Sequence, residues 1–352
     1  MKKRINFIDI ARAFAMIFIV LGHTLVHSEH CRLIFKFLYS FHVVLFFILS
    51  GYTFKLKNES FLSFIKNKFI RIMIPYFVWA VLFLIPYMIL GSKVGDTIGT
   101  TSSFDLSKQL LNVLYGNGNM SALKQNSALW FLPALFTMEV VYYLIIRLVN
   151  KYKKITFPVL ISSISINYIV NAFLPIILPW GINTALTLGT FFYLGYLFKN
   201  YKVFENNSKL FNKYYIIIIL IIGVLACFFN KSNVSCIEYE YGYFTLALIS
   251  GLCLSIVFIY IAYLINKNKV LEYIGRNTMG ILIFHKLIIL IFQTKLGIIS
   301  KLLKNSNIYL ELSLSILVVI LSIIFSLLAT EIVRRIFPLL IGEIKKRNNI
   351  NT

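Results

Sequence analysis

The sequence predicts an all-α membrane protein that crosses the bilayer about ten times, and three observations support this. Of its 352 residues, 59% are hydrophobic and 14% are charged, and the mean hydropathy is +0.81, whereas soluble domains are roughly half apolar. Apolar runs long enough to cross a hydrocarbon core of about 30 Å recur along the whole chain. Basic residues gather in alternate connections between these runs, as they do in multi-span membrane proteins.

Ten apolar runs are expected to form the spans. They cover residues 5–27, 34–54, 70–91, 129–149, 155–173, 181–198, 214–230, 243–265, 277–292 and 309–333. The first run follows Met-Lys-Lys-Arg, as the apolar part of a signal peptide would. It is too long for that role and no A-x-A cleavage site follows it, so we expect it to remain as a membrane helix.

The basic residues also predict the orientation. An even number of spans puts both termini on one side, where we count 24 Lys and Arg residues against nine on the other. Cytoplasmic loops are the ones enriched in basic residues, so both termini are expected in the cytoplasm. The net charge of +22 is scattered over short loops beside apolar spans, a pattern that favours contact with membrane lipids over nucleic acid.

The chain is expected to form a single membrane domain over residues 1–352. Its longest polar connection, 92–128, is expected as an outer loop. One amphipathic helix around DLSKQLLNVLY in this loop could lie over a cavity as a lid. Residues 334–352 are expected as a cytoplasmic tail.

An amphipathic cytoplasmic helix is expected just before the third span. Leu62, Ile65, Phe69 and Ile72 recur at spacings of three and four residues, with lysines between them. Pro75 then lies inside the span, where it must kink the helix and free a carbonyl.

Ionisable residues in the first span are functional candidates, because such a side chain in hydrocarbon costs several kcal/mol unless it faces a cavity or a partner. Arg12 and His23 are about three helical turns apart, so they share a face and lie about 16 Å apart along the axis. Asp9 shares that face closely enough for an ion pair with Arg12. The alternative is that Asp9 and Arg12 only neutralise one another and that His23 only anchors the outer end.

Two further histidines lie inside apolar runs. His42 is about 12 Å below the outer end of the second span, and antiparallel packing could bring it level with His23. Two imidazoles at one depth suit proton abstraction from a hydroxyl; the alternative is a histidine bonded to a helix carbonyl. His285 lies about 12 Å from the inner end of the ninth span, where a lone histidine could equally be structural.

Three other charged residues are candidates. Lys68 and Arg71, three residues apart at the cytoplasmic mouth of the third span, could receive a polyanion or could be a positive-inside flank. Glu139 is expected to be an unpaired carboxylate at depth, and Pro133 breaks the same span, which favours a cavity there. The four cysteines show no metal-ligand spacing and no C-x-x-C pattern, so no metal site is expected.

Together these residues resemble the acyltransferase-3 family of bacterial membrane O-acyltransferases, which includes acetylases of surface polysaccharides and the fucose 4-O-acetylase-like group. The blocks that carry the resemblance are D-I-A-R-x10-H (Asp9, Arg12, His23), FH-x3-FF-x2-SGY (Phe41 to Tyr52), R-x3-PY (Arg71, Pro75, Tyr76), LWFLPALF (Leu129 to Phe136), FFYLGYLF (Phe191 to Phe198) and G-x-NT-x-GI-x-IFH, which ends at His285. They run through nearly the whole chain in the order found in the family.

The resemblance implies that Arg12 and His23 are essential, with an acyl-CoA donor approached from the cytoplasm and a glycan acceptor at the membrane or beyond it. The family has R-x-x-R at the third helix, where this chain has Lys68 and Arg71; lysine keeps the charge but loses one planar fork for phosphate. Some relatives append an SGNH-type esterase domain. No such domain is expected here, so the membrane domain should complete transfer itself or pass the acyl group to a separate protein.

On this resemblance we expect a multi-pass protein of the bacterial plasma (inner) membrane that transfers an acetyl group from acetyl-CoA to a surface polysaccharide, such as capsule or O-antigen, or to its lipid-linked precursor. Acetyl-CoA would be a substrate, with no metal or bound cofactor, and succinyl remains an alternative acyl group. His23 is expected to act as general base or transient acyl carrier, and Asp9 to orient Arg12. The donor would be held by Arg12, Arg71 and Lys68. The acceptor would be positioned by His42, Glu139 and His285.

Two other classes of membrane protein share this composition. A polysaccharide-precursor exporter or flippase, and a glycan polymerase, are also basic, aromatic-rich and many-helix. Neither needs Arg12 together with Arg71 at the cytoplasmic mouth, nor any dependence on acetyl-CoA.

Overall fold

The computed structural model describes residues 5–25, 30–85, 88, 105–116, 123, 126–174, 177–205, 211–295 and 307–344. Across these residues the regular structure is helical, apart from one isolated β-bridge between Ser235 and Glu240. The all-α class is therefore confirmed. The described α-helices are α1 (Asn6–Leu25), α2 (Arg32–Tyr39), α3 (His42–Thr53), α4 (Phe61–Lys68), α5 (Ile74–Leu82), α7 (Leu106–Tyr115), α8 (Phe131–Lys151), α9 (Thr156–Phe173), α10 (Ile182–Asn200), α11 (Lys213–Phe229), α12 (Phe244–Ile265), α13 (Lys269–Arg276), α14 (Thr278–Lys295) and α16 (Ile308–Ile336).

Six described segments are long and apolar enough to cross a membrane, as expected of a polytopic membrane protein. They are Asn6–Leu25, Arg32–Thr53, Ser127–Lys151, Lys153–Phe173, Phe244–Ile265 and Ile308–Ile336. A seventh span results if the bent pair α13 and α14, with 83° between its two parts, is counted as one. Each of the ten expected runs holds at least part of a helix, but ten spans and cytoplasmic termini stay predictions.

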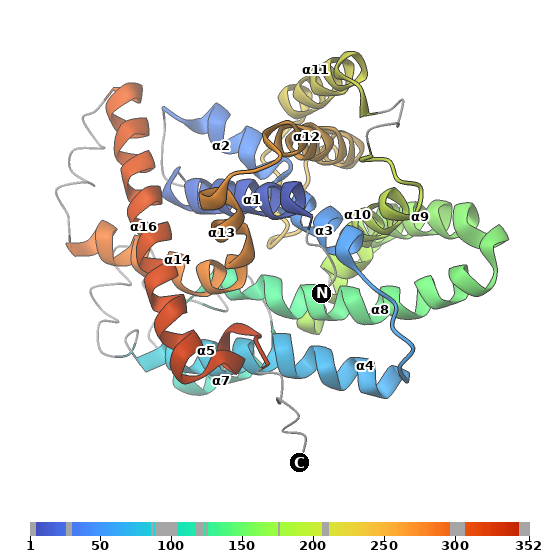
Figure 1. Ribbon diagram of the computed structural model, residues 1–352. Coiled ribbons are helices and arrows are strands. Elements are labelled where there is room, and N and C mark those ends of the chain that lie inside the picture. Colours follow the sequence, from blue (N-terminus) through green and yellow to red (C-terminus); the bar gives the residue numbers. More distant parts are fainter. Residues whose placement is uncertain are drawn as a thin grey trace.

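Helix α1 lies at the centre of the molecule. It packs against α3, α12, α13, α14 and α16, and Figure 1 shows it enclosed between these elements. Peripheral α9 and α11 turn apolar side chains such as Ile161 and Phe228 outward, as expected of surfaces that face lipid. The polar face of α1 is therefore directed at other helices, not at hydrocarbon.

Two glycines let α3 and α10 approach each other at backbone distance. A Cβ on Gly51 would lie 1.8 Å from the carbonyl oxygen of Phe192, and one on Gly195 would lie 2.0 Å from that of Ile48. Small residues allow such close helix contacts in membranes. The contact fixes α3, which carries one wall of the cavity described below.

Helices α4 and α5 are joined through a π-helical turn, Phe69–Met73, that the sequence explains. Pro75 has no N–H to donate to the carbonyl of Arg71, four residues earlier. The N–H of Ile74 bonds instead to the carbonyl of Phe69, five residues earlier. We expected a kink at Pro75, and the structure has a widened turn there. Such turns are often found at functional sites.

The expected helix in the outer loop is confirmed as α7. Of residues 92–128, the structure describes 105–116, 123 and 126–128. Asp105 caps the helix by accepting from the N–H of Lys108. The helix lies along α5, where the hydroxyl of Tyr76 donates to the carbonyl of Val113 at 2.8 Å.

Candidate functional site

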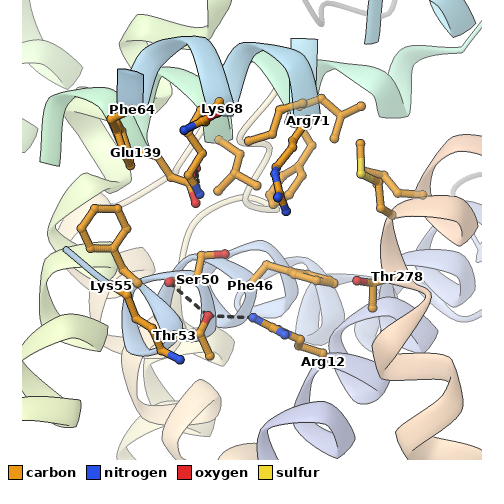
Figure 2. A pocket seen from close by; sticks show the side chains of 18 of the residues that line it. Arg12, Phe46, Ser50, Thr53, Lys55, Phe64, Lys68, Arg71, Glu139 and Thr278 are labelled. Atoms are coloured by element: carbon orange, nitrogen blue, oxygen red, sulfur yellow. Dashed lines mark hydrogen bonds and ion pairs between the residues drawn. The ribbon is translucent and has the colours of Figure 1, made fainter. Parts of the chain in front are cut away.

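A cavity of about 400 Å³ lies between α1, α3, α4 with its π-turn, α8 and α14. Figure 2 shows it from close by, with Lys68 and Arg71 on one side and Arg12, Thr53 and Lys55 on the other. Helix α7, which we expected as a lid, contributes none of the described lining residues.

One end of the cavity is strongly cationic. Its charged lining residues are Arg12, Lys55, Lys57, Lys68 and Arg71, with Glu59 and Glu139 as the carboxylates. The excess of cations favours a ligand with several negative charges, such as phosphates. We call this part the cationic mouth.

Arg12 is held against the wall of the cavity by Thr53. Its guanidinium donates to the Thr53 hydroxyl at 2.7 Å, and that hydroxyl donates in turn to the carbonyl of Leu49 at 2.9 Å. Because the Thr53 proton is directed at its own helix, the hydroxyl oxygen is left to accept from Arg12. No sequence pattern indicates Thr53, since this contact depends on how α1 and α3 pack.

Asp9 is buried, and Arg276 lies closer to it than Arg12 does. The Arg276 guanidinium donates to Asp9 at 3.0 Å and to Glu272 at 2.6 Å. The expected ion pair between Asp9 and Arg12 is present but longer, at 3.9 Å. A Cβ on Gly275 would lie 1.8 Å from the Asp9 carbonyl oxygen, so α13 is held tightly on α1 at this point, and Asp9 does not line the cavity.

The cationic mouth also contains Lys68 and Arg71, the two residues expected to bind the acyl donor, and their contacts differ. The ammonium of Lys68 forms an ion pair with Glu139 at 2.6 Å, so the expectation of an unpaired Glu139 is wrong. Glu139 lies with the cations of the mouth and not with the histidines. Arg71 comes from the widened π-turn and points into the cavity (Figure 2). Its side chain makes no hydrogen bond or ion pair with any described residue.

The other end of the cavity is apolar, because the innermost lining residue on each of four helices has an apolar side chain. These residues are Ile19 on α1, Phe46 on α3, Phe131 on α8 and Leu282 on α14. Each of these four residues is three or four positions, about one helical turn, away from a polar residue in the same part of the chain. Those polar residues are His23, His42, Ser127 and His285, respectively.

The three histidines expected to act on the acceptor come together beyond this apolar end. The rings of His23 and His285 are 5.3 Å apart, and His42, His285 and Lys286 all act electrostatically on His23. The Nδ1–H of His42 donates to the carbonyl of Leu38 at 2.6 Å. His42 therefore lies near His23 as antiparallel packing predicts, and it is also bonded to a carbonyl of the preceding helix.

His285 is fixed in one tautomer. Its Nδ1 bonds to the carbonyl of Ile281 at 2.8 Å, and since a carbonyl only accepts, this nitrogen carries the proton. The Nε2 is then a bare, buried lone pair with no hydrogen-bond partner among the described residues. Lys286, which we did not single out from the sequence, donates from the next position to the hydroxyl of Ser127.

No three His, Cys, Asp or Glu side chains of the described residues are grouped as metal ligands. None of the four cysteines, all of which belong to the described part of the chain, forms a disulfide. Cys236 lies in the connection between α11 and α12, where burial raises the pKa of its thiol to about 12. No disulfide therefore contributes to the site, and Cys236 is not a reactive thiolate.

The comparisons with known proteins address the family. Residues 5–331 match the family described as an acyltransferase domain, acyltransferase-3. No curated protein and no solved structure matches the chain. Because the match spans far more than half of the sequence, the chain belongs to the acyltransferase-3 family and is a membrane acyltransferase.

Proposed function

We propose that this acyltransferase moves an acetyl group from cytoplasmic acetyl-CoA to a hydroxyl of a surface polysaccharide or of its lipid-linked precursor, in the bacterial plasma membrane. The observation that carries the proposal is the order of residues along four helices. From the mouth inward, α1 presents Arg12, Ile19 and His23 in turn. Helix α3 presents Thr53, Phe46 and then His42, and α14 presents Thr278, Leu282 and then His285. Helix α8 presents Glu139 and then Phe131, and Ser127 follows in the 3-10 turn that precedes this helix.

The cationic mouth would hold the phosphates of coenzyme A. Arg12 and Arg71 are the main candidates, because guanidinium forks match phosphate oxygens. Lys68 would contribute less, since Glu139 already neutralises its charge. The thin pantetheine arm would extend along the apolar part of the cavity, toward the histidines.

His23 would act as the general base. It would take the proton from the acceptor hydroxyl while the hydroxyl oxygen bonds to the thioester carbonyl carbon. The carbon–sulfur bond then breaks, and the coenzyme A thiolate takes up a proton. The products are an O-acetyl sugar and free coenzyme A. His42, whose Nδ1 proton is bonded to a helix carbonyl, would present its other nitrogen to the sugar. The Nε2 of His285, whose Nδ1 proton is likewise bonded, would accept from His23 and so hold the base in place for the acceptor.

Transfer of label from acetyl-CoA tests the proposal. The purified chain in lipid vesicles would be supplied with acetyl-CoA labelled in the acetyl group and with de-acetylated surface glycan from the source cells. We expect label in the glycan, as base-labile O-acetyl groups. A glycan that crosses the membrane or lengthens without taking up label would support an exporter or a polymerase and would contradict the proposal.

A further inference from the structure

The apolar end of the cavity is a layer of four side chains, which we call the floor. It consists of Ile19, Phe46, Phe131 and Leu282, all at most 7% exposed. The rings of Phe46 and Phe131 meet edge to face, 5.6 Å apart, and Phe131 also stacks on Phe47 at 5.3 Å. Two aromatic rings from different helices thus brace each other across the end of the cavity.

The floor lies at a defined distance from the cationic mouth on one side and from the histidines on the other. Arg12 and Ile19 are seven residues apart on α1, which is about 10 Å along the axis, and Ile19 and His23 are one turn, about 6 Å, apart. A thioester that places its phosphates at the mouth would reach the floor with its acyl end. The His23 and His285 rings, which are 5.3 Å apart, lie about one turn beyond the floor.

We infer that the floor is the acyl subsite, and that Phe46 and Phe131 set the length of the acyl group. The donor class is a short, unbranched acyl thioester of two or three carbons. A longer chain would have to occupy the volume of a ring in a close-packed layer, and such layers do not yield without strain. The inference rests on the proposed function, because it takes an acyl-CoA as the ligand of the cavity.

Equilibrium competition tests this length limit without knowledge of the acceptor. The full chain in lipid nanodiscs would bind labelled coenzyme A, displaced by unlabelled coenzyme A, acetyl-CoA, propionyl-CoA or butyryl-CoA. For the wild type we expect butyryl-CoA to bind at least about tenfold more weakly than acetyl-CoA. In Phe46→Ala and Phe131→Ala the affinity ratio of butyryl-CoA to acetyl-CoA should rise about tenfold, because each methylene that finds an apolar space contributes roughly fourfold.

A matched control is Phe157→Ala, because Phe157 is 65% exposed on the outer face of α9; its ratio should equal that of the wild type. Equal affinities of the wild type for acetyl-CoA and butyryl-CoA would overturn the inference without any variant. So would an unchanged ratio in both floor variants, if they fold. Absence of coenzyme A binding would overturn the proposed function along with the inference, whereas binding without length preference overturns the inference alone.

Discussion

His23 on α1 and His285 on α14 lie with their rings 5.3 Å apart, although they come from opposite ends of the chain. The Nδ1–H of His285 is bonded to the Ile281 carbonyl, so its Nε2 can only accept a proton or a hydrogen bond. If the N–H of His23 donates to this Nε2, the His23 ring is held in one orientation and its other nitrogen is left to act as the base. The neighbouring histidine can therefore position His23 for catalysis.

Removing the acceptor nitrogen of His285 should slow turnover without weakening donor binding. We expect His285→Leu to lower kcat roughly tenfold to a hundredfold, below the 10²–10⁴ range for loss of a general base itself. The KM for acetyl-CoA should hardly change, because the cationic mouth is three turns away. His285→Gln, whose amide oxygen can accept a hydrogen bond, should recover part of the rate. Equal loss in both variants would argue for a packing role.

The Thr53 hydroxyl should contribute to donor binding through Arg12. Thr53→Val removes the acceptor at 2.7 Å from the guanidinium, and a hydrogen bond to a charged group is worth about 1.5 kcal/mol or more. The Kd for acetyl-CoA should rise about tenfold. Thr53→Ser keeps the hydroxyl and should recover most of the affinity. Identical affinities for Val and Ser would show that Arg12 does not depend on this contact.

The pair of Lys68 and Glu139 should behave as a buried ion pair. Lys68→Met leaves the Glu139 carboxylate buried without its cation, at a cost of about 3 kcal/mol. Glu139→Gln should cost less, since the Lys68 side chain is 28% exposed and can reach water. The double variant Lys68→Met, Glu139→Gln should regain stability relative to Lys68→Met alone. Thermal unfolding in detergent measures all three, and simple additivity of the two changes would exclude the coupling.

Stability should depend on keeping a cation beside Asp9. It is 3% exposed, whereas the Arg276 side chain is 37% exposed and also holds Glu272. Arg276→Met should therefore lower the unfolding temperature by several degrees, because it removes the closer cation from a buried carboxylate. Asp9→Asn should lower it less, since a neutral amide can still accept from Arg276. The opposite order of stabilities would show that Arg12, and not Arg276, is the main partner of Asp9.

The predicted orientation can be tested with single cysteines, because the native thiols on the expected outer side, Cys31 and Cys236, are buried. Cys236 has a pKa of about 12, so its thiolate is scarce at neutral pH. In intact cells, an impermeant maleimide should label Lys231→Cys, between α11 and α12. It should label Lys151→Cys, at the end of α8, only after permeabilisation. Both positions are exposed, and the reverse pattern would put the termini outside.

Much of the site could be predicted from periodicity within one helix. The shared face of Arg12 and His23 follows from helical geometry, as does the interruption at Pro75. The same arithmetic places Ile19 between Arg12 and His23. Polar residues inside apolar runs were thus correctly identified as residues that face the interior.

Partners on other helices could not be predicted, because they depend on packing between distant segments. Arg276 lies 267 residues from Asp9 and looked like an ordinary basic residue of a loop. Glu139 looked unpaired because Lys68 was assigned to the cytoplasmic mouth. The helix α7 was identified correctly, but its place along α5 depends on contacts such as the one from Tyr76 to Val113.

The central claim is that Arg12 and His23 serve two different steps, donor binding and proton removal, at the two ends of one passage. The most direct test measures the Kd for acetyl-CoA and the rate of acetyl transfer on the same preparation of His23→Ala. We predict a Kd close to that of the wild type and a transfer rate at least a hundredfold lower. Undiminished transfer, or a loss of transfer that follows a parallel loss of acetyl-CoA binding, would contradict this account.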